Sequence, residues 1–380
     1  MSHDIEYRTP GQLIQALMED RGWTQRVLAI ILGVDETGIN RIVSDKRPVN
    51  ARMAIILGEI FNVDPETFLE LQKQFDLAQA RFASRPDPGR TNRAHLFGRL
   101  PIGEMIKRRW IAASDVRKVD EVEKSLIRFF GVNFTDEIEI LPHAAKKTSV
   151  NGEVTPAQLA WLYRVREIAS EMLVPRYSPA AVRKAVSKLK NLLSAAEEAR
   201  KVPRILAEAG IRYLVVESLD GAKIDGVCFW LNNVSPVVAM SLRYDRIDNF
   251  WFVLRHELEH VLRLHGRSSI MLDVELEGER AGTGVGVSEE ERIANEAAAD
   301  FCLPQKSLDN FIARKEPFFA ERDIAGFART LNIHPGLVAG QLQHRIERYD
   351  LFRNHLAKIR HIVAPSALVD GWGDVAPVGL

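Results

Sequence analysis

The chain has 380 residues, enough for two or three domains with cores of their own. Lysine plus arginine and aspartate plus glutamate number 51 each, so no global charge drives the chain onto nucleic acid or a membrane. Two cysteines are too few for a disulfide framework, and we see neither a signal peptide nor a run of about 18 apolar residues. We therefore predict a soluble cytoplasmic protein with no membrane partner.

The first 72 residues carry the pattern of a bundle of short helices. Apolar residues at helical spacing predict helices over 11–20, 25–32, 36–43 and 50–61, which Thr24, Asp35 and Asn50 can cap. The second and third helices, joined by a glycine-containing turn, have the form of a helix-turn-helix unit. We expect the second helix of that unit and the loop after it to contact DNA through these exposed side chains: Glu36, Thr37, Asn40, Arg41, Lys46 and Arg47.

Charge favours a plainer interpretation of the same helices. Residues 1–72 hold seven basic and eleven acidic side chains, and a monomer with this excess of negative charge would bind DNA weakly. The alternative is a helical bundle that serves only as a protein-interaction module.

A family resemblance outweighs this charge argument. The segments PGQLIQALMEDRGWTQRVLAIILGV, INRIVSDKRPVNARMA and LELQKQFDL, within residues 9–77, resemble HigA-like antitoxins of the XRE class. The resemblance implies a homodimer that binds operator DNA and neutralises a toxin. On this ground we prefer DNA binding to the pure interaction module.

Residues 79–152 are less informative. Two prolines, a glycine and the lack of an apolar period predict a linker over 79–92. Beyond it, 102–109 and 120–130 are predicted helices, and we assign no function to residues 93–152.

The pattern changes from helices to strands near residue 210. Thr155 and Ser178, each followed by a proline, are typical helix starts within the segment 155–210. Short β-branched or aromatic runs at 211–216, 226–231 and 236–242 then predict a small sheet. We expect Val237 to Ser241 at the edge of this sheet, where a peptide substrate could add as a further strand. The fold class is therefore mainly α with a small β-sheet, α+β.

The segment FWFVLRHELEHVLRLHG, residues 250–266, carries the most specific motif of the chain. It places His256 and His260 one helical turn apart with Glu257 between them, the H-E-x-x-H pattern of zinc peptidases. The helix is apolar nearly all round and hence buried, and buried ionisable groups are costly unless paired or metal-bound. The alternative is that the two histidines are ordinary core residues with hydrogen-bond partners. That alternative does not account for the buried carboxylate of Glu257 between them. We therefore predict a Zn²⁺ site, which needs three protein ligands.

The third ligand should come from another helix. His265 lies nine residues after His256, about 900° around a continuous helix, so it would face the opposite side. We expect His265 to lie at the C-terminal end of the helix, where its side chain interacts with the helix macrodipole. The predicted helix over 289–303 offers two candidates, Glu291 and Glu296.

A second resemblance favours Glu291. The segments SLRYDRIDNFWFVLRHELEHVLRLHG and ERIANEAAADFCLP resemble the ImmA/IrrE metallopeptidases, and the likeness extends from about residue 155 to residue 343. The resemblance implies a zincin-like domain whose third zinc ligand is Glu291, with Glu296 in reserve. Asn295, one turn from Glu291, would support the ligands. The chain departs from the family pattern at Ala297 and Glu259.

The motif also predicts the catalytic roles. Glu257 would take a proton as water attacks a peptide carbonyl and pass it to the leaving amine. A donor for the developing oxyanion is needed, and Arg243, Tyr244 and His334 are the candidates among which the sequence does not choose.

Together these patterns predict a DNA-binding regulator or antitoxin fused to a zinc metallo-endopeptidase. Its partners would be operator DNA and a protein substrate, either a repressor or a toxin-system component. The alternative is a non-catalytic repressor-antitoxin whose peptidase-like domain binds a partner or senses metal. The predicted divisions are a helix-turn-helix domain (1–78), a linker and helical middle region (79–152), the peptidase domain (153–310), packing helices (311–363) and a disordered tail (364–380).

Overall fold

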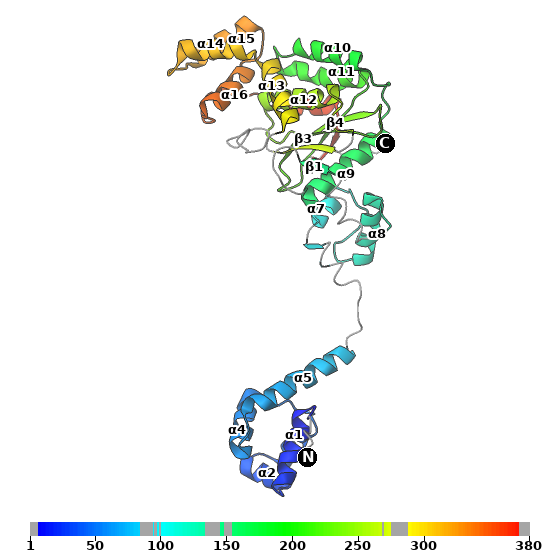
Figure 1. Ribbon diagram of the computed structural model, residues 1–380, viewed down its shortest axis with the longest axis vertical. Coiled ribbons are helices and arrows are strands. Elements are labelled where there is room, and N and C mark those ends of the chain that lie inside the picture. Colours follow the sequence, from blue (N-terminus) through cyan, green and yellow to red (C-terminus); the bar gives the residue numbers. More distant parts are fainter. Residues whose placement is uncertain are drawn as a thin grey trace. The chain divides into compact units, whose positions relative to one another are not determined.

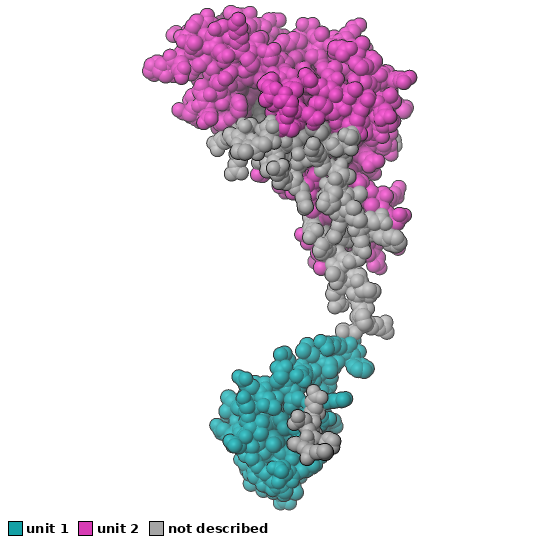
Figure 2. Space-filling view, in the orientation of Figure 1, with its two compact units in different colours: residues 1–89 teal, residues 90–380 magenta. Residues whose placement is uncertain are grey.

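The computed structural model describes residues 7–83, 94, 97–98, 100–133, 145–147, 154–267, 270–274 and 288–371. The chain forms two compact units, residues 1–89 and residues 90–380, drawn in teal and magenta in Figure 2. The fold class is α+β, as predicted, because helices dominate and the strands form one sheet.

Unit 1 is a bundle of five helices (Figure 1) among its described residues. The predicted N-caps are confirmed, since the side chains of Thr24, Asp35 and Asn50 each accept a backbone N–H of the first turn that follows. The helices are α1 (Pro10–Asp20), α2 (Gln25–Leu32), α3 (Glu36–Val43), α4 (Ala51–Phe61) and α5 (Pro65–Ala83). Their apolar faces meet in one core that includes Ile14, Leu28, Ile39, Leu57 and Phe68.

The last helix of unit 1 corrects the predicted linker. α5 runs through Ala83, so residues 79–83 are helical and not part of a linker. Periodicity missed this extension because the C-terminal half of α5 is exposed on all sides, with Phe82 98% exposed. Residues 84–92, the rest of the predicted linker, lie outside the described residues.

Unit 2 contains a six-stranded mixed sheet with the order β1-β5-β3-β4-β2-β6. The three predicted strands are confirmed as β2 (Arg212–Val216), β3 (Ile224–Trp230) and β4 (Pro236–Met240). The sequence did not predict the other three strands, which are β1 (Ala145–Lys147), β5 (Ile270–Val274) and β6 (Leu368–Asp370).

Two predictions about this sheet are wrong. β4 lies between β3 and β2, so the segment Val237 to Ser241 is interior and cannot accept a peptide as an added strand. Within the predicted disordered tail, residues 364–366 form a 3-10 turn and β6 pairs in parallel with β2. Residues 372–380 lie outside the described residues.

Helices cover both faces of the sheet (Figure 1), because alternate strand residues point to opposite sides. On one face, Leu214, Val237 and Leu272 pack against α7 (Ile102–Lys107), α8 (Val119–Phe130) and α9 (Pro156–Glu171). The helices of region 93–152, to which the sequence assigned no function, therefore help to bury this face.

The opposite face carries the remaining helices. Val215, Cys228 and Val238 share a core with α12 and with the helices that surround it. These are α10 (Pro179–Lys190), α11 (Val202–Glu208), α12 (Ile247–Leu262), α13 (Glu289–Cys302), α14 (Gln305–Lys315), α15 (Glu321–Leu331), α16 (Pro335–Ile346) and α17 (Arg360–Val363), with short 3-10 turns at 196–201 and 353–355. The helix with the H-E-x-x-H motif thus lies directly on the sheet.

A buried ion pair ties β6 to α9. Arg164 Nε lies 2.5 Å from Asp370 Oδ2, and the two side chains are 9% and 2% exposed. We predict that Asp370→Ala lowers the free energy of unfolding of unit 2 by about 3 to 5 kcal/mol, because it leaves a buried guanidinium without its main partner. Urea denaturation measures this loss. Asp350→Ala, which breaks the exposed Arg348–Asp350 pair, should change stability little.

Candidate metal centre

The H-E-x-x-H helix is the most enclosed helix of unit 2. α12 packs against β3 on one side and against α13 on another, so its polar motif lies inside the protein. His256, Glu257 and His260 are 0% exposed, and Glu291 on α13 is 2% exposed. Ser288 positions Glu291 by capping α13, since its hydroxyl accepts the backbone N–H of Glu291. A local cap and a helix-pair contact therefore bring the glutamate to the histidines.

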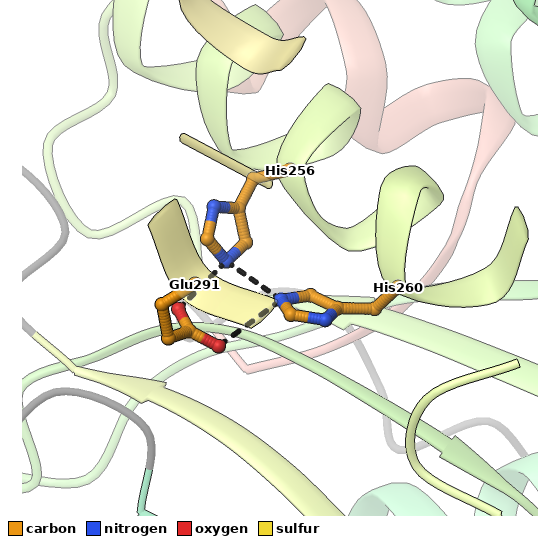
Figure 3. Close-up of side chains that lie close together, drawn as sticks. All are labelled: His256, His260 and Glu291. Carbon is orange, nitrogen blue, oxygen red and sulfur yellow. Dashed lines mark hydrogen bonds and ion pairs between the residues drawn. The ribbon is translucent and has the colours of Figure 1, made fainter. Parts of the chain in front are cut away.

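Three side chains converge at one point (Figure 3). The Nε2 atoms of His256 and His260 lie 3.0 Å apart, and the carboxylate of Glu291 faces both. Its Oε2 lies 3.3 Å from His256 Nε2, and its Oε1 lies 3.3 Å from His260 Nε2. One potential ligand atom from each residue lies within 4.8 Å of the others, so the group could hold a metal ion.

The chemistry of this donor set fits zinc. Two imidazole nitrogens and one carboxylate oxygen are the ligands of a catalytic zinc site with a fourth position left open. Two imidazole nitrogens that face each other at 3.0 Å in a dry site are unfavourable unless a proton or a cation lies between them. The buried arrangement of His256, His260 and Glu291 therefore favours a bound cation over hydrogen bonds among neutral side chains.

The two candidates for the third ligand, Glu291 and Glu296, lie in different surroundings. Glu291 lies in the group, whereas the side chain of Glu296 is 64% exposed and forms an ion pair with Arg292. Five residues of helix turn the two carboxylates about 500° apart around α13, so they leave the helix on different faces.

Both histidines are held by their second ring nitrogen. His256 Nδ1 lies 3.0 Å from Oδ1 of Asn295, which can only accept, so the N–H is on Nδ1 and the Nε2 lone pair faces the site. Asn295, predicted to support the ligands, thus contacts His256. His260 Nδ1 lies 3.0 Å from Nδ1 of His265.

The contact of His265 was not predicted. A continuous helix would turn His265 away from the site, but α12 ends at Leu262 and Leu264 adopts a left-handed φ of 62°, which turns the chain back. His265 is thus no member of the converging group, yet it touches a member of it. Burial lowers the pKa of His265, which favours the neutral imidazole that can share a hydrogen bond with His260. A positive φ at a leucine gives no sequence signal.

Glu257 faces the sheet and packs against Gly226 of β3. A Cβ at position 226 would lie 2.1 Å from Glu257 Oε1, far inside van der Waals contact. The glycine is therefore required for the carboxylate to reach its position, and the pairing of β3 with β5 shifts register at the same residue. Sequence reasoning missed Gly226 because a lone glycine in a strand indicates only a close approach of some kind.

The three oxyanion candidates lie in different surroundings. The guanidinium of Arg243 stacks over the Tyr244 ring at 4.8 Å and donates to the backbone oxygen of Lys223. His334 caps α16, because its Nδ1 accepts the backbone N–H of Gly336. Burial lowers the pKa of His334, which keeps this nitrogen free to accept. His334 thus has a structural role at a helix start.

The six predicted DNA contacts are all exposed positions of unit 1. Ile39 and Ile42 of α3 are buried, so the polar side chains of α3 face outward. Asn40 donates to the side chain of Gln25 on α2, 3.2 Å away, which links the two helices of the motif. The exposed positions are Glu36, Thr37, Asn40, Arg41, Lys46 and Arg47.

Comparison with known proteins defines the class of unit 1. Residues 14–68 match the helix-turn-helix family, so the N-terminal unit carries a helix-turn-helix domain of the XRE class, which supports a DNA-binding regulator. The chain is also similar to virulence-associated protein A' of Dichelobacter nodosus, with 37% identity over 71 residues. These residues are 18% of this chain and 62% of that relative, so the match spans less than two thirds of the relative. No helix among the described residues is long and apolar enough to cross a membrane.

Proposed function

We propose that this protein is a DNA-binding regulator with a zinc-dependent endopeptidase domain that hydrolyses a peptide bond in a specific partner protein. The observation that carries the enzymatic part is the convergence of His256, His260 and Glu291 beside Glu257. The resemblance of residues 155–343 to the ImmA/IrrE metallopeptidases supports it. By the same resemblance, the partner is a repressor or a toxin-system component.

Each polar residue of the centre has a role in this proposal. His256, His260 and Glu291 would hold the ion, and bound zinc supplies Lewis-acid activation of water at near-neutral pH. Asn295 fixes the tautomer of His256, and His265 fixes the ring of His260. Glu257 takes the proton from the attacking water and gives it to the leaving amine. Burial excludes bulk water and strengthens the interactions of these charges.

Metal removal tests the enzymatic proposal directly. The purified full-length protein, loaded with Zn²⁺ or stripped by a chelator, is added to a lysate whose own metallopeptidases have been inactivated by heat. New peptide N-termini are then mapped by mass spectrometry. We expect a small set of new N-termini with the zinc form, and identical N-termini in both samples would overturn the proposal.

The position of Glu257 provides a second test of the same mechanism. Gly226→Ala forces the carboxylate of Glu257 away from β3, because the added Cβ would occupy its place. A displacement of about 1 Å lowers catalytic rates by on the order of 10²-fold. We therefore expect the rate of peptide cleavage to fall by that factor, while the zinc content, measured by mass spectrometry of the metal, is unchanged. Gly103→Ala, where no atom lies within 4 Å of the new Cβ, is the matched control.

For unit 1 we propose binding to operator DNA as a homodimer, with α3 in the major groove. The matched helix-turn-helix domain supports DNA contact, and a dimer would present two reading helices to compensate for the acidic net charge. The likeness to HigA-like antitoxins adds a toxin as a further partner of this unit.

A single arginine tests the DNA proposal. Arg41 is exposed on the outward face of α3 and its guanidinium can contact a guanine or a phosphate. We expect Arg41→Ala to weaken binding to the promoter of the protein's own gene by about 1 to 3 kcal/mol, or roughly 5- to 150-fold. Fluorescence anisotropy at a stated salt concentration measures the change. Arg314→Ala, an exposed arginine in unit 2, should leave DNA affinity unaltered.

One observation favours a second candidate function. The side chains of His256, Glu257, His260 and Glu291 are at most 2% exposed, so a peptide must displace protein atoms to reach them. A centre of this kind suits a repressor-antitoxin whose metal stabilises or reports on unit 2 without hydrolysis. The two candidates differ in what they require of Glu257, since only hydrolysis needs a base there.

A further inference from the structure

A cavity continues the seam between α12 and α13 beyond the metal centre. The two helices pair His260 with Glu291 and His256 with Asn295, so they run in opposite directions along this seam. One and two turns further on, Phe252 and Asp248 of α12 face Ala299 and Cys302 of α13. These residues line a cavity of about 580 Å³, open to solvent on one side, to which α16 and the first residue of α14 also contribute.

The cavity adjoins the metal centre through one side chain. Asn295 lines the cavity while its Oδ1 holds His256 Nδ1, and the Phe252 ring lies 6.4 Å from the His256 ring, centroid to centroid. A molecule in the cavity would therefore touch the residue that fixes the tautomer of His256. The volume lies within the range of about 300 to 1,000 Å³ of small-molecule pockets.

The lining combines apolar and aromatic walls with acidic groups. Phe252, Leu337 and Cys302 supply apolar surface, and Tyr244 and Tyr349 supply two aromatic rings. These walls would cover the body of a ligand of up to drug size.

The two arginines of the lining are already engaged. Arg246 forms an ion pair with Asp248, and Arg345 forms one with Asp309, 2.9 Å away. Their positive charge is therefore neutralised within the protein, and the lining does not favour an anionic ligand.

Asp300 differs from the arginines and Asp248 of the lining, which form ion pairs. It lines the cavity, and among the described residues it forms no ion pair; its Oδ1 accepts the backbone N–H of Gln305 at 3.2 Å. Burial lowers the pKa of Lys190, against the smaller opposing effect of the nearby Asp300 charge, and its amino group donates to the backbone oxygen of Phe301 instead of pairing with Asp300. A cation that enters the cavity could pair with this exposed carboxylate.

We propose that the cavity is a binding site for a ligand that joins an apolar or aromatic body to a cationic end. An arginine or lysine side chain of a peptide and a free arylalkylamine share this chemistry. The cationic end pairs with Asp300, and the body packs on Phe252 and Leu337. The proposal holds whether or not the metal centre hydrolyses peptides.

Calorimetric titration of the full-length protein with matched probes tests this site. The free probe is 4-phenylbutylamine with 4-phenylbutanol as its neutral counterpart, and the peptide probe is a blocked phenylalanyl-arginine dipeptide with its citrulline analogue. We expect at least one cationic probe to bind about tenfold or more tightly than its neutral counterpart, as one charge-assisted hydrogen bond allows. The probe that shows this preference identifies the source of the ligand, free amine or peptide.

Two variants locate the binding. Asp300→Asn keeps the oxygen that accepts from Gln305 and removes the charge, so it should abolish the preference for the cation, whereas Glu208→Gln on α11 should retain it. Ala299→Phe fills the cavity and should abolish binding of the preferred probe, with the zinc content and the unfolding midpoint unchanged as proof of folding. Equal binding of the charged and neutral probes, or a preference that survives Asp300→Asn, would overturn the proposal.

Discussion

Glu291→Ala is expected to remove most of the protein's affinity for zinc. The side chain supplies the one carboxylate of the converging group, so alanine leaves two protein ligands and removes the one negative charge among them. Structural zinc sites with four ligands bind with about 10 to 16 kcal/mol, and the loss of one ligand's share corresponds to an affinity on the order of 10²- to 10³-fold lower. Competition with a fluorescent zinc chelator measures this loss.

The matched control is Glu296→Ala, five residues further along the same helix. Its carboxylate is exposed and paired with Arg292, and we expect this variant to retain zinc at wild-type affinity. Zinc should also raise the unfolding temperature of the wild type and of Glu296→Ala but not that of Glu291→Ala, because a ligand stabilises only the fold that binds it. Loss of zinc in Glu296→Ala with retention in Glu291→Ala would contradict the assignment of the third ligand.

The parts of the fold that depend on local signals could be predicted from the sequence. Thr24, Asp35 and Asn50 cap their helices where predicted, because a cap needs only a side chain and the next turn of backbone. The pairing of His256 with His260 is equally local, since helical geometry alone places residues i and i+4 together. Strands β2, β3 and β4 were recognisable from composition because both of their faces are buried.

The parts that depend on distant contacts could not be predicted. The sequence predicts β4 at the edge of the sheet, yet its position is set by parallel pairing with β2, and β2 in turn pairs with β6 about 150 residues later. β6 has three residues, too few for a periodic pattern, and its Asp370 is explained only by the ion pair with Arg164. Short strands of this kind are defined by their neighbours in the sheet.

The candidate site shows the same division. Residues 256–260 form a contiguous motif, whereas the choice between Glu291 and Glu296 needed a family resemblance and the role of His265 needed the left-handed turn at Leu264. Gly226 lies thirty-one residues before Glu257 and becomes meaningful only when β3 packs against α12. Residues that support a site from another element carry little local signal.

Glu257→Gln is expected to abolish peptide cleavage without loss of zinc. Glutamine has nearly the same shape as glutamate, so it can occupy the space that Gly226 leaves, but its amide cannot accept a proton from water at neutral pH. General acid–base catalysis contributes about 10²- to 10⁴-fold to rates, and we expect the rate of formation of the metal-dependent N-termini to fall by that factor. Mass spectrometry of the N-termini and of the metal measures both properties in one preparation.

The same variant separates the two candidate functions inside cells. Glu171→Gln changes an exposed glutamate at the end of α9 and should leave cleavage, zinc content and DNA binding unaltered. If Glu257→Gln abolishes cleavage in vitro and also the cellular effect of the protein, hydrolysis is the function of the centre. If the variant retains every cellular effect of the wild type, the endopeptidase proposal is wrong and the buried metal serves the repressor-antitoxin, because stabilisation of unit 2 needs His256, His260 and Glu291 but no base at position 257.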